Sequence, residues 1–176
     1  MLNRRIGRNE LNAIQTCLAY VDAQREYASV DRDVDGVIEY ARKFHSDEGR
    51  DGLYWEVSED EQPSPLGPLL AAAATEGYDL TKSSDVSRSY HGYYYKILEA
   101  QGPDAPGAAY SCVINGNMVA GFALVAWPAL YGQSGIMTFI VNQNGIVYET
   151  DLGPETAKIA GTMTKYNPDP NWRRAQ

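Results

Sequence analysis

The chain has 176 residues, of which 44% are hydrophobic and 22% are charged, and its net charge is −8. This length is enough for one domain with a hydrophobic core, and the charges are too few and too mixed in sign for a disordered chain. An acidic chain also disfavours nucleic acid as a partner, because phosphate binding needs clustered Lys and Arg. We expect one α+β domain over residues 1–176, with mainly helices and loops in 1–84, an antiparallel sheet in 85–151, and a C-terminal helix and tail in 152–176.

The first predicted element is an amphipathic helix from Asn9 to about Ser29, with Asn9 as its N-cap. Apolar residues recur along it at steps of three and four, which describes one stripe of a helix. These residues are Leu11, Ile14, Leu18 and Val21. We expect this stripe to face the core.

An acidic loop follows at residues 31–40, with the sequence DRDVDGVIEY. Carboxylates on alternate positions followed by glycine form the first half of an EF-hand calcium loop. The twelfth position, where an EF-hand has a bidentate Glu, is Arg42. The loop therefore supplies about five oxygens, and the shell needs water or the nearby Asp47, Glu48 or Asp51. The predicted calcium ligands are Asp31, Asp33, Asp35, Val37 and Glu39.

A short second helix is predicted directly after this loop, over residues 37–44. In the alternative to a metal site, the aspartates form an acidic turn in which Asp35 caps this helix. If calcium binds, we expect a structural role, because a short partner helix and an incomplete shell do not suggest a tuned sensor.

The middle of the chain is predicted to be a surface loop over residues 45–67, followed by a brief helix that ends at Gly77. The longest apolar stretches, residues 69–74 and 119–130, fall short of the roughly 20 residues that span a bilayer. The sequence therefore contains no predicted membrane span.

The second half of the chain is rich in aromatic and β-branched residues separated by turn signals. Asn115-Gly116 and Asn144-Gly145 are hairpin signals, because a two-residue type I′ turn needs positive φ at both positions. The predicted strands are residues 90–100, 108–114, 118–127, 135–141 and 146–151, before a last helix over 154–166. The expected fold is a long N-terminal helix packed on a four- to five-stranded antiparallel meander sheet.

The tyrosine cluster of the first predicted strand should divide between the two faces of the sheet. Tyr93 and Tyr95 share one side and Tyr94 lies on the other. One set is expected to pack under the helix. The other set is suited either to cross-strand aromatic pairing or to contact with a protein or glycan partner.

The two cysteines, Cys17 and Cys112, lack the CxxC spacing of zinc and redox sites. We expect both to face inward, on the helix and on the sheet respectively. They are interpreted as buried free thiols, with a single bridge as the alternative in an exported protein.

His91, beside Gly92, is the main catalytic candidate, with Cys112, Asp104 or other acidic residues as partners. The chain contains no HExxH, GxSxG or GxxxxGK[ST] motif. We therefore favour a non-enzymatic protein in which His91 is structural. The alternative is a hydrolase of unknown substrate that uses His91 with acidic neighbours.

Several long segments between Arg4 and Trp172 occur together in this chain, among them DGLYW, SPLGPL, HGYYYKILEAQGPDAPGAAY and GFALVAWPALYGQSGIMTFIVNQNGIVYETDLG. In these segments the chain resembles the bacterial family known as domain of unknown function 2950. The resemblance implies an exported envelope protein, periplasmic or secreted, with a further N-terminal region upstream. The family has no assigned activity or catalytic residues.

A weaker likeness concerns architecture. The segment NELNAIQTCLAYVDAQREYAS, followed much later by GYYYKI and FIVNQNGIVYE, is similar to the globular part of type IV pilins and pseudopilins. The hydrophobic half of the pilin helix, which builds the filament, is absent. This likeness implies a pilin-like soluble domain, acting as a structural or binding module.

Overall fold

The computed structural model describes residues 2–47, 49–78 and 89–175. Its helices are α1 (Leu2–Tyr27), α2 (Gly67–Thr75) and α3 (Thr156–Thr162), the last preceded by a 3-10 turn, Gly153–Glu155. No helix within these ranges combines the length and apolarity needed to cross a membrane.

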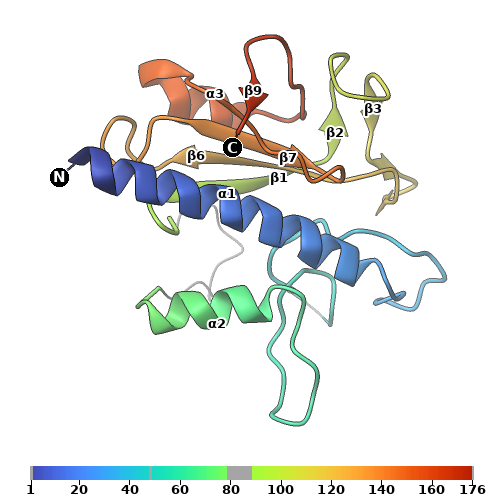
Figure 1. Cartoon of the computed structure of the whole chain (residues 1–176). Coiled ribbons are helices and arrows are strands. Elements are labelled where there is room, and N and C mark those ends of the chain that lie inside the picture. Colours follow the sequence, from blue (N-terminus) through green and yellow to red (C-terminus); the bar gives the residue numbers. More distant parts are fainter. Residues whose placement is uncertain (1, 48, 79–88, 176) are drawn as a thin grey trace.

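The main sheet has the strand order β1 (Tyr93–Leu98), β6 (Ala123–Pro128), β7 (Thr138–Asn142), β8 (Tyr148–Thr150) and β9 (Arg173–Arg174). Every neighbouring pair is antiparallel, as a meander requires. Figure 1 shows α1 lying across one face of this sheet and α3 on the opposite side. The predicted α+β arrangement of an N-terminal helix on an antiparallel sheet is confirmed.

The chain leaves the main sheet between β1 and β6 and forms two small hairpins there. One pairs β2 (Ala100–Gln101) with β3 (Tyr110–Ser111), and the other pairs β4 (Val113–Ile114) with β5 (Asn117–Met118).

Both predicted hairpins exist, but they differ in detail from the expectation. Asn115 and Gly116 have φ values of 52° and 90°, as the two-residue turn requires. The long strand that follows, β6, pairs with β1 and β7 and not with residues 108–114, so that part of the prediction was wrong. At the second hairpin, β7 ends at Asn142 and β8 begins at Tyr148. Residues 143–147 therefore connect the two strands, in place of the expected two-residue turn at Asn144-Gly145.

Helix α1 is longer than predicted, and only Ile14 and Val21 of the predicted stripe pack on the core. It begins at Leu2, so Asn9 is no N-cap; its Nδ2 donates to the Ser134 carbonyl at 2.8 Å. Leu11 and Leu18 are 62% and 41% exposed, which contradicts the predicted stripe at these two positions. The buried face consists mainly of Ala13, Cys17, Tyr20, Val21, Gln24 and Tyr27.

Alternate residues of the strands face two separate apolar clusters. Leu124 and Ala126 of β6 pack toward α1, whereas Val125 and Trp127 pack toward α3. The tyrosines divide as predicted, with Tyr93 and Tyr95 on the α1 side and Tyr94 on the other. Tyr94 is half-buried against Trp127, with ring centroids 5.8 Å apart, so it takes part in aromatic pairing.

The predicted helix over residues 37–44 does not form. The Tyr40 N–H donates to the Met118 carbonyl at 2.8 Å, which ties this segment to β5 instead. The Ala41 N–H donates to Gln24 Oε1 at 2.8 Å, and Gln24 Nε2 donates back to the Ala41 carbonyl at 2.7 Å. Because these bonds take the main-chain groups that a helix would use, the segment is irregular and Asp35 has no helix to cap.

Candidate functional site

The acidic loop after α1 gathers three carboxylates around a tight turn. Asp31, Asp33 and Asp35 each offer an oxygen, and these atoms all lie within 4.8 Å of one another. Gly36 has a φ of 89°, which suits the glycine that an EF-hand loop needs at this position. Val34 has a φ of 61°, a strained conformation for a β-branched residue.

Main-chain N–H groups hold the first carboxylate of this loop in place. Asp31 Oδ1 accepts from the Val34 N–H at 2.8 Å, and Oδ2 accepts from the Gly36 N–H at 2.9 Å. The Gly36 bond is the largest cause of the lowered pKa of Asp31. Its carboxylate is therefore kept ionised, as a metal ligand must be.

The end of the loop is bound to the β4–β5 hairpin. Asp35 accepts from the Val37 N–H at 2.7 Å and from Asn117 Nδ2 at 3.0 Å, while Glu39 accepts from the Met118 N–H at 3.2 Å. Burial raises the pKa of Glu39, and the charges of Asp33 and Asp35 raise it further. The carboxylates of this segment therefore repel one another.

Asp33 and Glu39 line a shared pocket of about 370 Å³, together with Lys43 and Asp51. Lys43 Nζ lies 2.7 Å from Asp47 Oδ2 and 2.7 Å from Asp51 Oδ2. Two of the residues expected to complete a calcium shell are therefore bound to a lysine. The third, Glu48, lies outside the described residues.

His91 lies just before β1, where it meets the end of α2. Its Nε2 is 3.0 Å from Glu76 Oε2, and its ring packs against Tyr90, with centroids 4.2 Å apart. The expected partners lie elsewhere: Asp104 accepts from Asn167 Nδ2 at 2.8 Å, and Cys112 is buried in the core cluster on the α1 side. No local sequence signal could have identified Glu76, because the pairing depends on how α2 docks.

The family model described as "Protein of unknown function (DUF2950)" matches residues 1–175. The chain belongs to the DUF2950 family. No curated protein and no solved structure matches it. The pilin likeness therefore stays a prediction.

Both cysteines of this DUF2950 protein are free and buried, with exposed fractions of 0% and 2%, as predicted for inward-facing thiols. Burial raises the pKa of Cys17 to about 12 and that of Cys112 to about 11. Thiols of this kind are poor nucleophiles at neutral pH.

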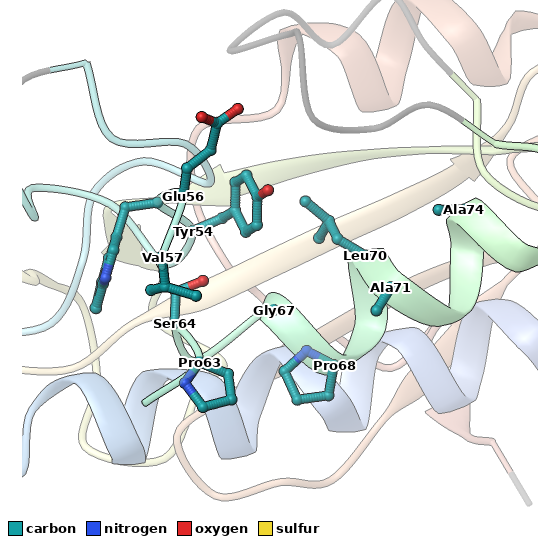
Figure 2. Close-up of a pocket in the computed structure, with 11 residues that line it drawn as sticks. Tyr54, Glu56, Val57, Pro63, Ser64, Gly67, Pro68, Leu70, Ala71 and Ala74 are labelled. Atoms are coloured by element: carbon teal, nitrogen blue, oxygen red, sulfur yellow. The ribbon is translucent and has the colours of Figure 1, made fainter. Parts of the chain in front are cut away.

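A second pocket of the DUF2950 protein, about 520 Å³ in volume, lies between residues 54–57 and α2. Figure 2 shows Tyr54, Val57 and Leu70 on its walls, with Pro63 and Pro68 at one end. This pocket was not predicted from the sequence. Its signal was the alanine run of α2, because small side chains leave room beside a helix that larger ones would fill.

Proposed function

We propose that this protein is a non-enzymatic, exported structural or binding module of the bacterial cell envelope, in which calcium holds the segment after α1. The family resemblance supports the proposed location. The observation that supports the calcium site is the grouping of Asp31, Asp33 and Asp35, whose ligand oxygens lie within 4.8 Å of one another. Val37, through its carbonyl, and Glu39 complete the proposed ligand set.

Calcium would relieve the electrostatic repulsion among these carboxylates. Three carboxylates at this separation destabilise one another when no cation lies between them, and Ca²⁺ accepts several oxygen ligands in a flexible geometry. The same loop connects α1 to the β4–β5 hairpin through Asp35 and Glu39. A bound ion would therefore fix this irregular segment against the rest of the fold.

The test is thermal unfolding in millimolar Ca²⁺ and in excess chelator. Binding to the native state alone stabilises by roughly 2.7 kcal/mol at a hundredfold excess over Kd, a Tm increase on the order of 5 to 10 °C for a chain of this length. Mg²⁺ should give a smaller increase, because it demands a stricter octahedral shell.

Two variants locate the effect. Asp33→Ala should abolish the calcium-dependent increase, whereas Asp22→Ala, which removes an exposed carboxylate of α1, should retain it. Identical melting curves in calcium and in chelator would mean that the aspartates only stabilise a turn, and the calcium site would be abandoned.

A hydrolase that uses His91 is the second candidate function. The observation in its favour is the 3.0 Å contact between His91 Nε2 and Glu76, because a carboxylate can orient an imidazole as a general base. To separate the two functions, turnover of a panel of chromogenic ester and glycoside substrates and the Tm are measured for the parent chain and for the His91→Ala variant. An enzyme loses turnover and keeps its Tm, whereas a structural histidine loses Tm and has no turnover to lose.

A further inference from the structure

The pocket beside α2 has the size and walls of a ligand site. Its volume of about 520 Å³ lies within the range of roughly 300–1,000 Å³ that is typical of such sites. Tyr54, Val57, Pro63 and Leu70 give it mainly apolar walls (Figure 2). None of its lining residues belongs to the acidic loop at 31–39, so this inference does not depend on calcium.

The loop that forms one wall of the pocket is acidic. Glu56 lines the pocket, and Glu59, Asp60 and Glu61 follow it in a stretch that is exposed throughout residues 56–63. Residues 53–66 contain no Lys, Arg or His, and neither does α2. Arg50, which reaches Glu61 at 3.5 Å, and Arg32 both lie beside this wall at Trp55, but two guanidinium groups do not balance the four carboxylates. The entrance therefore attracts positive charge.

The ring of Trp55 already stacks with two arginine side chains. The guanidinium carbons of Arg32 and Arg50 lie over its ring, 5.5 and 5.3 Å from the centroid. A sugar would stack on a free aromatic face, and these arginines already occupy this one. The pocket is therefore poorly suited to a neutral glycan.

Two hydrogen-bond donors at the pocket wall are unpaired. Trp55 Nε1 and the hydroxyl of Ser64, a residue only 1% exposed, are both buried and have no partner among the described residues. An unpaired buried donor costs roughly 1–3 kcal/mol. An occupant that brings acceptors would therefore gain from reaching them.

We propose that this pocket binds an extended, basic, proline-containing peptide segment of a partner protein. A polyproline II chain has no internal hydrogen bonds, so its carbonyls are free to accept from the two donors. Its proline rings suit apolar and aromatic walls, and its Lys or Arg side chains face Glu56. A simple organic cation would supply positive charge but no series of carbonyl acceptors for the two donors. A neutral sugar would supply acceptors but no positive charge, so the peptide fits both requirements better.

The two donors lie beneath the pocket surface, so binding requires a small shift of the wall formed by residues 56–63. This stretch is exposed, and Ser58 and Glu61 bond to each other within it. A segment with few buried contacts moves at a small free-energy cost. The base of the wall stays fixed, because the Leu66 N–H donates to the Leu53 carbonyl at 2.9 Å.

The experiment is fluorescence anisotropy with a labelled synthetic peptide of alternating Pro and Arg. We expect saturable binding that weakens as salt is raised. A matched peptide with Glu in place of Arg should not bind, and one with Gly in place of Pro should bind more weakly. Measuring in calcium and in chelator separates this site from the acidic loop, because peptide binding should persist in both.

Matched variants on α2 test the position of the site. Ala71→Phe fills the pocket and should lower the affinity by roughly tenfold, about 1.4 kcal/mol. Ala72→Phe adds the same ring at an exposed neighbour outside the lining and should leave the affinity unchanged. Glu56→Lys should weaken binding and reduce its salt dependence.

The proposal is overturned if the protein fails to bind the Arg peptide at millimolar concentration, if Ala71→Phe binds as well as the parent chain, or if the Glu peptide binds equally. Binding of a neutral oligosaccharide or a quaternary ammonium compound without peptide binding would also overturn it, in favour of a different ligand class.

Discussion

The main sheet and the irregular segment at residues 28–66 are held in place by different interactions. In the sheet, neighbouring strands exchange main-chain hydrogen bonds and bury both faces. In the irregular segment, scattered main-chain bonds such as the one from the Tyr40 N–H to the Met118 carbonyl are supplemented by individual polar side chains: Gln24 binds both main-chain groups of Ala41, and Arg42 donates twice to Glu99. The sheet should therefore be sensitive to lost volume, and the irregular segment to lost single polar groups.

The largest expected effect is loss of volume at the centre of the sheet. Phe139 on β7 is fully buried and packs on Tyr93, with ring centroids 5.7 Å apart. Phe139→Ala should lower the free energy of unfolding by about 3–5 kcal/mol, measured by urea denaturation. Phe44 of the irregular segment is only partly buried, so Phe44→Ala should have a smaller effect. If both variants lost the same free energy of unfolding, the sheet would not be more sensitive to lost volume than the irregular segment.

Loss of one polar side chain should loosen the irregular segment. Gln24→Ala leaves the buried N–H and carbonyl of Ala41 unpaired, which lowers the free energy of unfolding by roughly 1–3 kcal/mol. Hydrogen exchange should accelerate around residues 39–43 while β6 and β7 stay protected. Gln15→Ala, on the exposed face of α1, is the control and should change neither. Faster exchange throughout the sheet would show that the two regions unfold together.

Alkaline pH should weaken the core on the α1 side of the sheet. Burial raises the pKa of the Cys17 thiol from 9.0 to about 12, and that of Cys112 from 9.0 to about 11. In both cases the pKa in the folded state lies above the pKa in the unfolded state. The contribution of each buried thiol to the free energy of unfolding is therefore complete below about pH 9 and is lost as the pH rises toward the folded pKa. The loss is roughly 1.4 kcal/mol per pH unit for each thiol. Urea denaturation at pH 8 and pH 10 measures this loss.

The same thiols can be followed by their rate of labelling. At pH 8 both should react slowly in the native protein, and Cys112 faster than Cys17, because its pKa is raised less. Both should react rapidly in urea. Rapid modification of both thiols in the native state would contradict their burial.

The smallest expected effect is loss of the ion pair between the two regions. Arg42 Nε lies 2.9 Å from Glu99 Oε1, but the two side chains are 44% and 41% exposed. Arg42→Ala should therefore lower stability by only about 0.5–1 kcal/mol, less at high salt. A loss above about 2 kcal/mol would mean that the irregular segment is held mainly by this pair.

The same contrast explains which elements could be predicted from sequence. The turn at Asn115-Gly116 depends on the φ preferences of two adjacent residues, so local sequence was enough. Residues 37–44 have helix-like apolar spacing, yet their main-chain bonds go to Gln24 and Met118, which are distant in the sequence. Hydrogen-bond partners that are distant in the sequence produce no pattern in residues 37–44 themselves.

The buried face of α1 was predicted only in part, for a related reason. The aliphatic pattern correctly indicates Ile14 and Val21, but it misses that the sheet side offers aromatic rings and acceptors. Tyr20 uses it by donating from its hydroxyl to the Ala123 carbonyl at 3.2 Å while its ring packs on Phe122. The face that carries Tyr20, Gln24 and Tyr27 was therefore buried in preference to Leu11 and Leu18.

The grouping of the candidate calcium ligands could be predicted in part. The spacing of Asp31, Asp33 and Asp35 was enough to place them together, because a tight turn brings alternate residues close. The ion pairs of Lys43 with Asp47 and Asp51 join residues only four and eight positions apart, but they were not predicted, because they depend on the non-helical path that the chain takes after Lys43.

Strand β9 covers the edge of β8, so removal of β9 by a protease would change how the sheet meets other molecules. Arg173 and Arg174 pair with Glu149 and Tyr148 along the outer side of β8, and the Ala175 N–H donates to the Val147 carbonyl at 2.9 Å (Figure 1). A protease that trimmed these residues would bare the N–H and C=O groups of β8. Because an uncovered strand edge recruits strands from other molecules, a chain clipped before Arg173 should self-associate more readily than the unclipped chain.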